Sequence, residues 1–163
     1  MITTTLNRIR ACDPCAEGWA KLLAGLGKTE TDDEPLPYAK IVRINGIDDA
    51  LWACRAEPQH AREWRLFAVW CARRMQHLMT DPRSIAALDI AERHANGTAT
   101  NAELDAAWDA AGDAAIYDAG NVAWDAAWDV AWDAAQAVAR AVAGDDTWAE
   151  QTAEFLRIVG DPA

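Results

Sequence analysis

The sequence predicts an all-α fold in a single domain that spans residues 1–163. Three observations support this prediction. Capping residues, prolines and glycines divide the chain at intervals that suit helices. Between them, apolar residues recur at helical spacing, and alternating runs of β-branched residues are missing. A chain of 163 residues can bury one self-sufficient core. We therefore expect a bundle of about seven to nine helices.

The first predicted helix covers the segment "PCAEGWAKLLAGLG". Asp13 is the expected N-cap, because Pro14 follows it and proline suits the first helical position. Gly25 and Gly27 are expected to end the helix. Residues 28–37 are polar and contain two prolines, so they are predicted to form a loop.

Two short helices and a longer one are predicted next. "YAKIVRI" should be helical up to Asn45, and "IDDALWACRA" should form a helix that Asp48 or Asp49 caps. The segment 59–79 has helical periodicity. Its apolar positions are Trp64, Phe67, Cys71, Met75 and Leu78.

The remaining helices carry clearer signals at their ends. Asp81 precedes a proline and should cap a helix that stops at Asn96, which a glycine follows. Thr100 and Glu103 have the spacing of a capping box, in which each residue accepts a backbone hydrogen bond from the other. The segment "TWAEQTAEFLRIV" is typical of a final amphipathic helix.

The negative charge lies entirely in the C-terminal part of the chain. The net charge is −11, yet residues 1–99 contain 13 basic and 13 acidic side chains. Residues 100–163 contain 13 acidic side chains against only Arg140 and Arg157. Because contact with a nucleic-acid backbone needs cations, we expect no direct nucleic-acid binding by this half. A basic protein is its natural partner.

A 20-residue repeat lies within this acidic part. Residues 101–120 and 121–140 share eleven of twenty positions, although alanine richness inflates the match. At about 100° per residue, a continuous helix would turn the second copy by about 200° relative to the first. A break near Gly120 and Asn121 would bring both copies back to one face, so we predict an antiparallel helical hairpin rich in alanine, tryptophan and aspartate.

Aspartate recurs at four-residue intervals within each copy of the repeat, about 6 Å apart along a helix axis. Two such helices would approach the charge spacing of one DNA strand, about 3.4 Å. The candidate partner-binding residues are Asp105, Asp109, Asp113, Asp118, Asp125, Asp129 and Asp133. The alternative is a solvated face that only keeps an alanine-rich helix soluble. The neighbouring tryptophans are expected at the edge of the apolar face, where they hold the scaffold; they are Trp108, Trp124, Trp128 and Trp132.

The sequence contains no pattern that indicates catalysis or a cofactor. Cys12 and Cys15 form a CxxC pair, but the other candidate zinc ligands are scattered along the chain. Those candidates are Cys54, Cys71, His60 and His77. His94 falls in the last turn of a helix, where it suits the dipole or the C-cap. We therefore expect no enzyme activity, no metal and no cofactor, with the cysteines as small buried residues near a helix start.

Location is inferred by default. No run approaches the roughly 20 apolar residues that a membrane-spanning helix needs. The N-terminal stretch "MITTTLNRIRACDPC" lacks the apolar centre of a signal peptide. We expect a cytoplasmic protein that does not contact membranes and has reduced cysteines.

The segments "INGIDDALWACRA", "RLFAVWCARR" and "DPRSIAALDIAERHANGTAT", followed by alanine-rich helices, resemble the Imm-5-like family of immunity proteins from bacteria and phages. The resemblance covers residues 40–158. It implies an all-helical, non-catalytic protein that binds and neutralises a toxin or effector. Family members mix arginine with alanine in the last helices, whereas aspartate and tryptophan dominate here, which favours a basic partner.

Two functional hypotheses follow. The first is an inhibitor of the immunity or anti-defence type, which uses its acidic helices to occlude a nuclease toxin or a nucleic-acid-binding defence complex. A DNA mimic such as a phage anti-CRISPR protein belongs to this class. The second is a structural module that forms homo-oligomers through its alanine and tryptophan face, with acids that serve only solubility.

Overall fold

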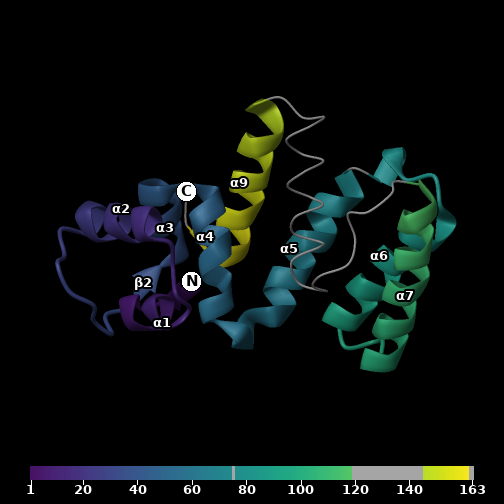
Figure 1. Ribbon diagram of the computed structural model, residues 1–163, viewed down its shortest axis with the longest axis horizontal. Helices are drawn as coiled ribbons and strands as arrows, with labels where there is room; N and C mark the ends of the chain where they lie inside the picture. The colour runs from purple at the N-terminus through teal and green to yellow at the C-terminus, as the bar shows by residue number, and fades with distance from the viewer. Residues whose placement is uncertain (75, 119–144, 162–163) are drawn as a thin grey trace. The chain divides into compact units, whose positions relative to one another are not determined.

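The computed structural model describes residues 1–74, 76–118 and 145–161 (Figure 1). These ranges contain eight α-helices, short 3₁₀ turns and two strands of two residues each. The all-α prediction is therefore confirmed. The predicted break at Gly120 and Asn121, and with it the hairpin, lies outside the described residues.

The chain divides into two compact units. Unit 1 combines residues 1–60 with residues 150–163, and unit 2 consists of residues 61–149. Unit 1 thus holds both ends of the chain (Figure 1), and unit 2 is inserted between its two segments. The assignment of the whole chain to one domain stays a prediction, and each unit is described by itself.

The N-terminal segment of unit 1 contains two features that the sequence did not predict. Strand β1 (Thr3–Thr4) pairs antiparallel with β2 (Leu36–Pro37). Helix α1 (Leu6–Ala11) follows β1, and the Thr5 hydroxyl accepts a hydrogen bond from the Arg8 backbone nitrogen at its start. Elements this short contain too few residues to show a periodic pattern.

Helix α2 (Ala16–Leu26) begins at a different residue from the one predicted. Asp13 has a φ of 56°, a left-handed conformation, whereas an N-cap needs extended backbone. Cys15 has that extended backbone, and its Sγ accepts a hydrogen bond from the Gly18 nitrogen at 3.3 Å. Cys15 therefore replaces Asp13 as the cap. Gly27, with a φ of 68°, ends the helix as predicted, whereas Gly25 lies inside the helix and does not end it.

Helices α3 (Tyr38–Asn45) and α4 (Ile47–Ala53) follow one another with only Gly46 between them. Gly46 has a φ of 100° and is the N-cap residue of α4, so no side chain caps this helix. The prediction that Asp48 or Asp49 caps it is wrong. Both lie in the first turn, where a carboxylate still interacts favourably with the helix dipole.

The predicted helix over 59–79 is divided into shorter elements. The helix predicted over "IDDALWACRA" ends in a 3₁₀ turn, η1 (Cys54–Ala56), and a second 3₁₀ turn, η2 (Pro58–His60), leads into α5 (Ala61–Arg74). A further 3₁₀ turn, η3 (Gln76–Leu78), follows α5. Helical spacing of apolar residues fits both kinds of helix over a few residues, so the pattern did not reveal the divisions.

Both ends of α6 and the start of α7 lie where the sequence predicts them, and the predicted end of α7 lies outside the described residues. Helix α6 (Pro82–Ala95) starts after Asp81, whose side chain accepts a hydrogen bond from the Arg83 nitrogen. Helix α7 (Asn101–Asp118) covers most of the first copy of the repeat. Helix α9 (Asp145–Val159) is the expected final helix.

Large aromatic side chains form the centre of unit 1. Tyr38 and Phe155 are fully buried, and their rings meet edge to face with centroids 6.2 Å apart. The Tyr38 hydroxyl donates a hydrogen bond to the Ala53 carbonyl at 2.9 Å. Near the chain ends, the Ile2 nitrogen donates to the Val159 carbonyl at 2.7 Å. Side-chain packing and a main-chain bond therefore join the C-terminal helix to the N-terminal segment.

A carboxylate is buried in the same unit. The Glu57 side chain is fully buried and accepts hydrogen bonds from Arg8, which also forms an ion pair with it, and from Gln59. Burial raises the pKa of Glu57, but these hydrogen bonds and the charge of Arg8 outweigh burial and hold the pKa below its ordinary value. Glu57 is therefore ionised, and its ion pair with Arg8 holds α1 in place.

Candidate partner-binding surface

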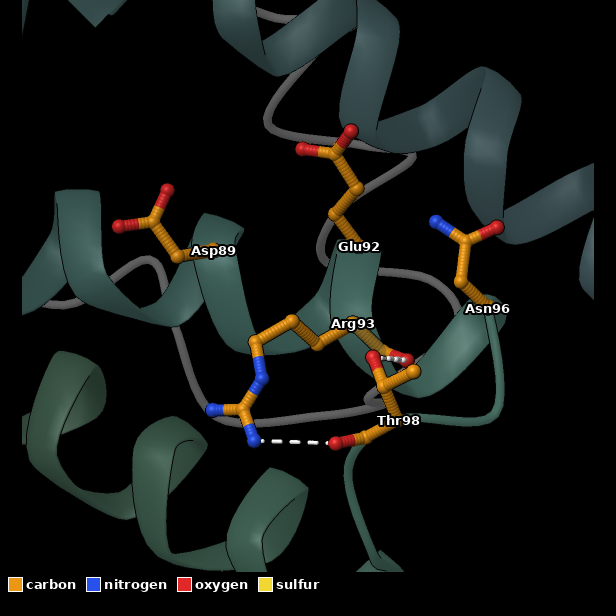
Figure 2. Close-up of a pocket in the computed structure, with 5 residues that line it drawn as sticks. All are labelled: Asp89, Glu92, Arg93, Asn96 and Thr98. Atoms are coloured by element: carbon orange, nitrogen blue, oxygen red, sulfur yellow. Dashed lines mark hydrogen bonds between the residues drawn. The ribbon is translucent and has the colours of Figure 1, made fainter.

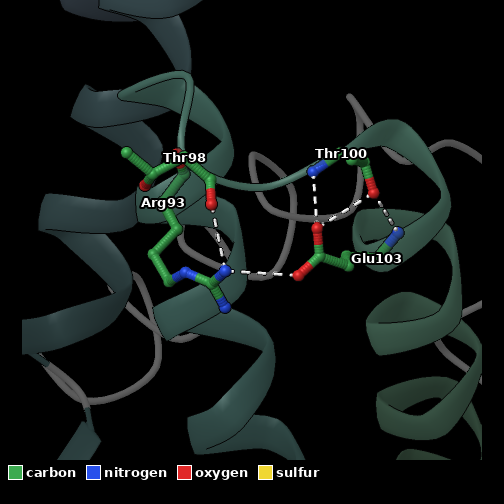
Figure 3. Close-up of polar contacts among 4 residues, drawn as sticks. All are labelled: Arg93, Thr98, Thr100 and Glu103. Carbon is green, nitrogen blue, oxygen red and sulfur yellow. Dashed lines mark hydrogen bonds and ion pairs between the residues drawn. The ribbon is translucent and has the colours of Figure 1, made fainter.

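The acidic helix α7 begins at the predicted capping box (Figure 3). The Thr100 nitrogen donates to Glu103 Oε2 at 2.8 Å, and the Glu103 nitrogen donates to Thr100 Oγ1 at 3.2 Å. The Thr100 hydroxyl also donates to the same carboxylate oxygen at 2.9 Å. The backbone hydrogen bond from Thr100 is the main cause that lowers the pKa of Glu103. The sequence prediction of this cap is confirmed.

Small side chains form the contact between α6 and α7. Helix α6 contributes three buried alanines at four-residue spacing: Ala87, Ala91 and Ala95. Helix α7 has half-buried residues at positions that share one helical face: Leu104, Ala107, Trp108 and Ala111. Alanine lets helix backbones approach closely, and the indole adds apolar area. Trp108 therefore lies at the boundary of the apolar face, as predicted.

Two of the predicted partner-binding residues are exposed on α7. Asp105 and Asp109 each follow a half-buried residue by one position, about 100° around the helix, so they lie beside the packed face. Helix α7 contains no basic residue. Among the ion pairs between described residues, none involves either aspartate. Both carboxylates are thus available to an external cation.

The structure describes less of the other five predicted partner-binding residues. Asp113 and Asp118 belong to α7, and their side chains are not described. Asp125, Asp129 and Asp133 lie outside the described residues, as do Trp124, Trp128 and Trp132. The structure therefore shows exposed carboxylates at Asp105 and Asp109, and partner binding by any of the seven aspartates stays a prediction.

One arginine joins α6 to the start of α7. Arg93 Nη2 donates to the Thr98 carbonyl at 3.0 Å and to Glu103 Oε1 at 3.2 Å (Figure 3). In the opposite direction, the Thr98 nitrogen and hydroxyl donate to the Arg93 carbonyl at 2.8 and 3.0 Å. A further contact joins His94 Nε2 to Asn101 Oδ1 at 2.7 Å. We call the set Arg93, Thr98, Thr100 and Glu103 the Arg93–Glu103 bridge.

A shallow, open hollow lies beside this bridge (Figure 2). Polar side chains line it: Asp89, Glu92, Arg93, Asn96 and Thr98. Arg73 forms ion pairs with Asp89 and Glu92, and Arg62 Nη2 donates to Asn96 Oδ1 at 2.9 Å. The two carboxylates in the hollow therefore share one arginine of α5 as their ion-pair partner.

Sequence reasoning missed these contacts between helices. The capping box revealed Glu103, because its signal lies within four residues. The pairing of Arg93 with Glu103 spans two helices, and that of Arg73 with Asp89 joins α5 to α6. Nothing in the local pattern indicates either, because such pairs depend on which helices pack together.

The cysteines have structural roles in the described part of the chain. Cys15 caps α2, Cys12 is the C-cap residue of α1, and Cys54 and Cys71 are buried. Burial raises the pKa of the Cys54 thiol. Cys15 is exposed, so the expectation that both members of the CxxC pair are buried is wrong. Within the described residues, no group of three or more side chains has metal-binding geometry.

Comparisons with family models, curated proteins and solved structures gave no match to this chain.

None of the described helices is long and apolar enough to cross a membrane.

Proposed function

We propose that this chain is a non-catalytic, protein-binding inhibitor of the immunity or anti-defence type. Its acidic helices would occupy the nucleic-acid-binding surface of a basic partner and exclude the nucleic acid by steric and electrostatic occlusion. The partner is a nuclease toxin or a nucleic-acid-binding defence complex. Mimicry of a DNA backbone, as in a phage anti-CRISPR protein, is the mechanism that we favour within this class.

The observation that carries the proposal is the pair of exposed, unneutralised carboxylates on α7. Asp105 and Asp109 lie beside the face that packs on α6, so a partner can reach them without separating α7 from α6. Other acids of the same unit, Asp89 and Glu103, are neutralised by arginines. The local negative field therefore originates at Asp105 and continues along α7.

The charge spacing limits what one helix can do. Carboxylates four residues apart are about 6 Å apart along the axis, nearly twice the 3.4 Å of one DNA strand. A close imitation of DNA therefore also needs the second copy of the repeat. The charge would chiefly accelerate association, and a smaller apolar contact would set the residence time.

The resemblance to the Imm-5-like family supports the same class. It suggests a protein that neutralises a toxin by binding it, without a chemical step. The dominance of aspartate in the last helices is the feature that directs the proposal to a basic target.

The test measures inhibition by a variant in which four aspartates are replaced by uncharged asparagines. The wild-type chain is titrated into a panel of basic nucleases and nucleic-acid-binding defence complexes, with cleavage or nucleic-acid binding as the readout. Replacement of Asp105, Asp109, Asp125 and Asp129 by Asn should abolish inhibition, while circular dichroism shows an unchanged helical spectrum. Full inhibition by this variant would contradict the electrostatic mechanism.

Light scattering separates this function from self-association. An inhibitor needs no second copy, so the wild-type mass should not change with concentration. A mass that rises with concentration, together with no inhibition in the panel, would favour the structural module that self-associates through its alanine and tryptophan face.

A further inference from the structure

The Arg93–Glu103 bridge fixes three segments of unit 2 with one side chain. The same guanidinium nitrogen contacts the Thr98 carbonyl and the Glu103 carboxylate. The second carboxylate oxygen of Glu103 accepts hydrogen bonds from the Thr100 nitrogen and hydroxyl. The end of α6, the connecting loop and the first turn of α7 therefore share one charge-assisted network.

The bridge lies next to the proposed binding residues. Glu103 is the third residue of α7, and Asp105 follows it by two positions. The buried side chains of α6 are all alanines, and none of the α7 side chains that the structure describes is more than half-buried. Polar contacts at the helix start therefore contribute to fixing where α7 begins and how it is rotated on α6.

We propose that Arg93 positions the acidic side of α7 for its basic partner, and so strengthens binding although it reduces the negative charge of the unit. This inference rests on the proposed function. Arg93 acts through Glu103 and Thr98 and does not contact the partner. It is a positioning residue.

The effect of Arg93→Gln on binding distinguishes a positioning role of Arg93 from an effect of its charge. Arg93→Gln makes the chain more negative by one charge. If charge alone governs recognition, a cationic partner associates faster with this variant. If Arg93 positions α7, the variant loses preference for a partner whose cations match the spacing of the aspartates. Charge alone therefore predicts faster association with an unchanged spacing preference, whereas positioning predicts a reduced spacing preference.

The experiment uses two synthetic helical peptides of equal charge. One carries arginines at four-residue intervals, to match Asp105 and Asp109, and the other carries the same arginines at irregular intervals. The full-length wild-type chain should bind the first peptide more tightly. Arg93→Gln should reduce this preference by about threefold to tenfold, the effect of a partly exposed charge-assisted contact.

Arg83→Gln is the matched control. It makes the same charge change at the other end of α6, where the Arg83 side chain pairs with Asp81, and the backbone cap from the Arg83 nitrogen is retained. This variant should keep the spacing preference and bind both peptides slightly faster. Arg93→Lys keeps the charge but lacks the planar fork of guanidinium, so it should restore the preference only in part.

Hydrogen exchange of the full-length chain gives a readout that needs no partner. Arg93→Gln should accelerate exchange of the first-turn amides of α7 by about threefold to tenfold, with unit 1 amides unchanged. An unchanged spacing preference in Arg93→Gln, or unchanged exchange in α7, would overturn the proposal. If the proposed function is wrong, the wild-type chain itself will bind the two peptides equally. That result does not depend on the Arg93 variants.

Discussion

Unit 1 and unit 2 are stabilised in different ways. Unit 1 buries Tyr38 and Phe155 completely and encloses the Glu57 carboxylate between donors. In unit 2, the contact between α6 and α7 consists of alanines and half-buried side chains, and ion pairs such as Arg93–Glu103 reinforce it at the surface. Unit 2 also buries Trp64 and Phe67 on α5, so the difference between the units concerns the contact between α6 and α7 and not the whole of unit 2.

The charges of the two units are also arranged differently. The residues of unit 1 include 8 bases and 12 acids, and those of unit 2 include 7 bases and 14 acids. The bases of unit 1 are interspersed with its acids along the sequence. In unit 2, the described bases belong to α5 and α6, and α7 has only acids. The charge of unit 2 is therefore segregated by helix.

The largest expected effect is truncation of the unit 1 core. Phe155→Ala removes a fully buried ring that meets Tyr38, so the free energy of unfolding should fall by about 3–5 kcal/mol. Trp108→Ala in unit 2 removes a half-buried ring and should cost about half as much. Urea denaturation measures both. If the two variants lose equal stability, the contrast between the units is wrong.

Loss of the buried charge should have the next largest effect. Glu57→Gln keeps the shape of the side chain but removes the charge that pairs with Arg8, and should cost about 1–3 kcal/mol. The pKa of Glu57 is lower in the folded chain than in the unfolded chain. Its stabilising contribution is therefore complete above the unfolded pKa and is lost as the pH falls through the folded pKa. Urea midpoints measured as the pH is lowered below 5 should fall less in Glu57→Gln, and parallel curves for the two proteins would contradict this role.

The close contact between α2 and α3 predicts a smaller effect in unit 1. A Cβ atom at Gly25 would lie 2.4 Å from Ile44 Cγ2. Gly25→Ala should therefore destabilise the chain by about 1–2 kcal/mol, although alanine favours helix formation. Ile44→Ala removes the clash. It should therefore cost less stability in the Gly25→Ala variant than in the wild-type chain. A gain in stability from Gly25→Ala alone would show that the contact is looser than described.

The smallest predicted effect concerns the capping box in unit 2. Thr100→Ala removes the side-chain acceptor for the Glu103 nitrogen and should cost about 1 kcal/mol. Thr100→Ser retains the hydroxyl and is the matched control. Hydrogen exchange should localise the loss to the start of α7. A loss spread over unit 1 amides would contradict a local role for the capping box.

Local signals were predicted from the sequence with more success than tertiary ones. The caps at Asp81, Thr100 and Glu103 were correct because each depends on residues within one turn. The prediction of Asp13 as an N-cap was wrong because its left-handed backbone does not have the extended conformation of an N-cap. The Arg93–Glu103 pair could not be predicted, because a sequence does not reveal which helices pack side by side.

Recognition through the acidic surface of α7 is tested most directly by two variants of the full chain, each with two carboxylates replaced by uncharged amides. One carries Asp105→Asn and Asp109→Asn on α7, and the other carries Glu17→Gln and Glu30→Gln, two exposed acids of unit 1. Association rates are measured at low ionic strength with a basic nuclease or defence complex that the wild-type chain inhibits. The first variant should associate about tenfold more slowly, and the second should match the wild type. Equal rates for the two variants would contradict recognition through α7.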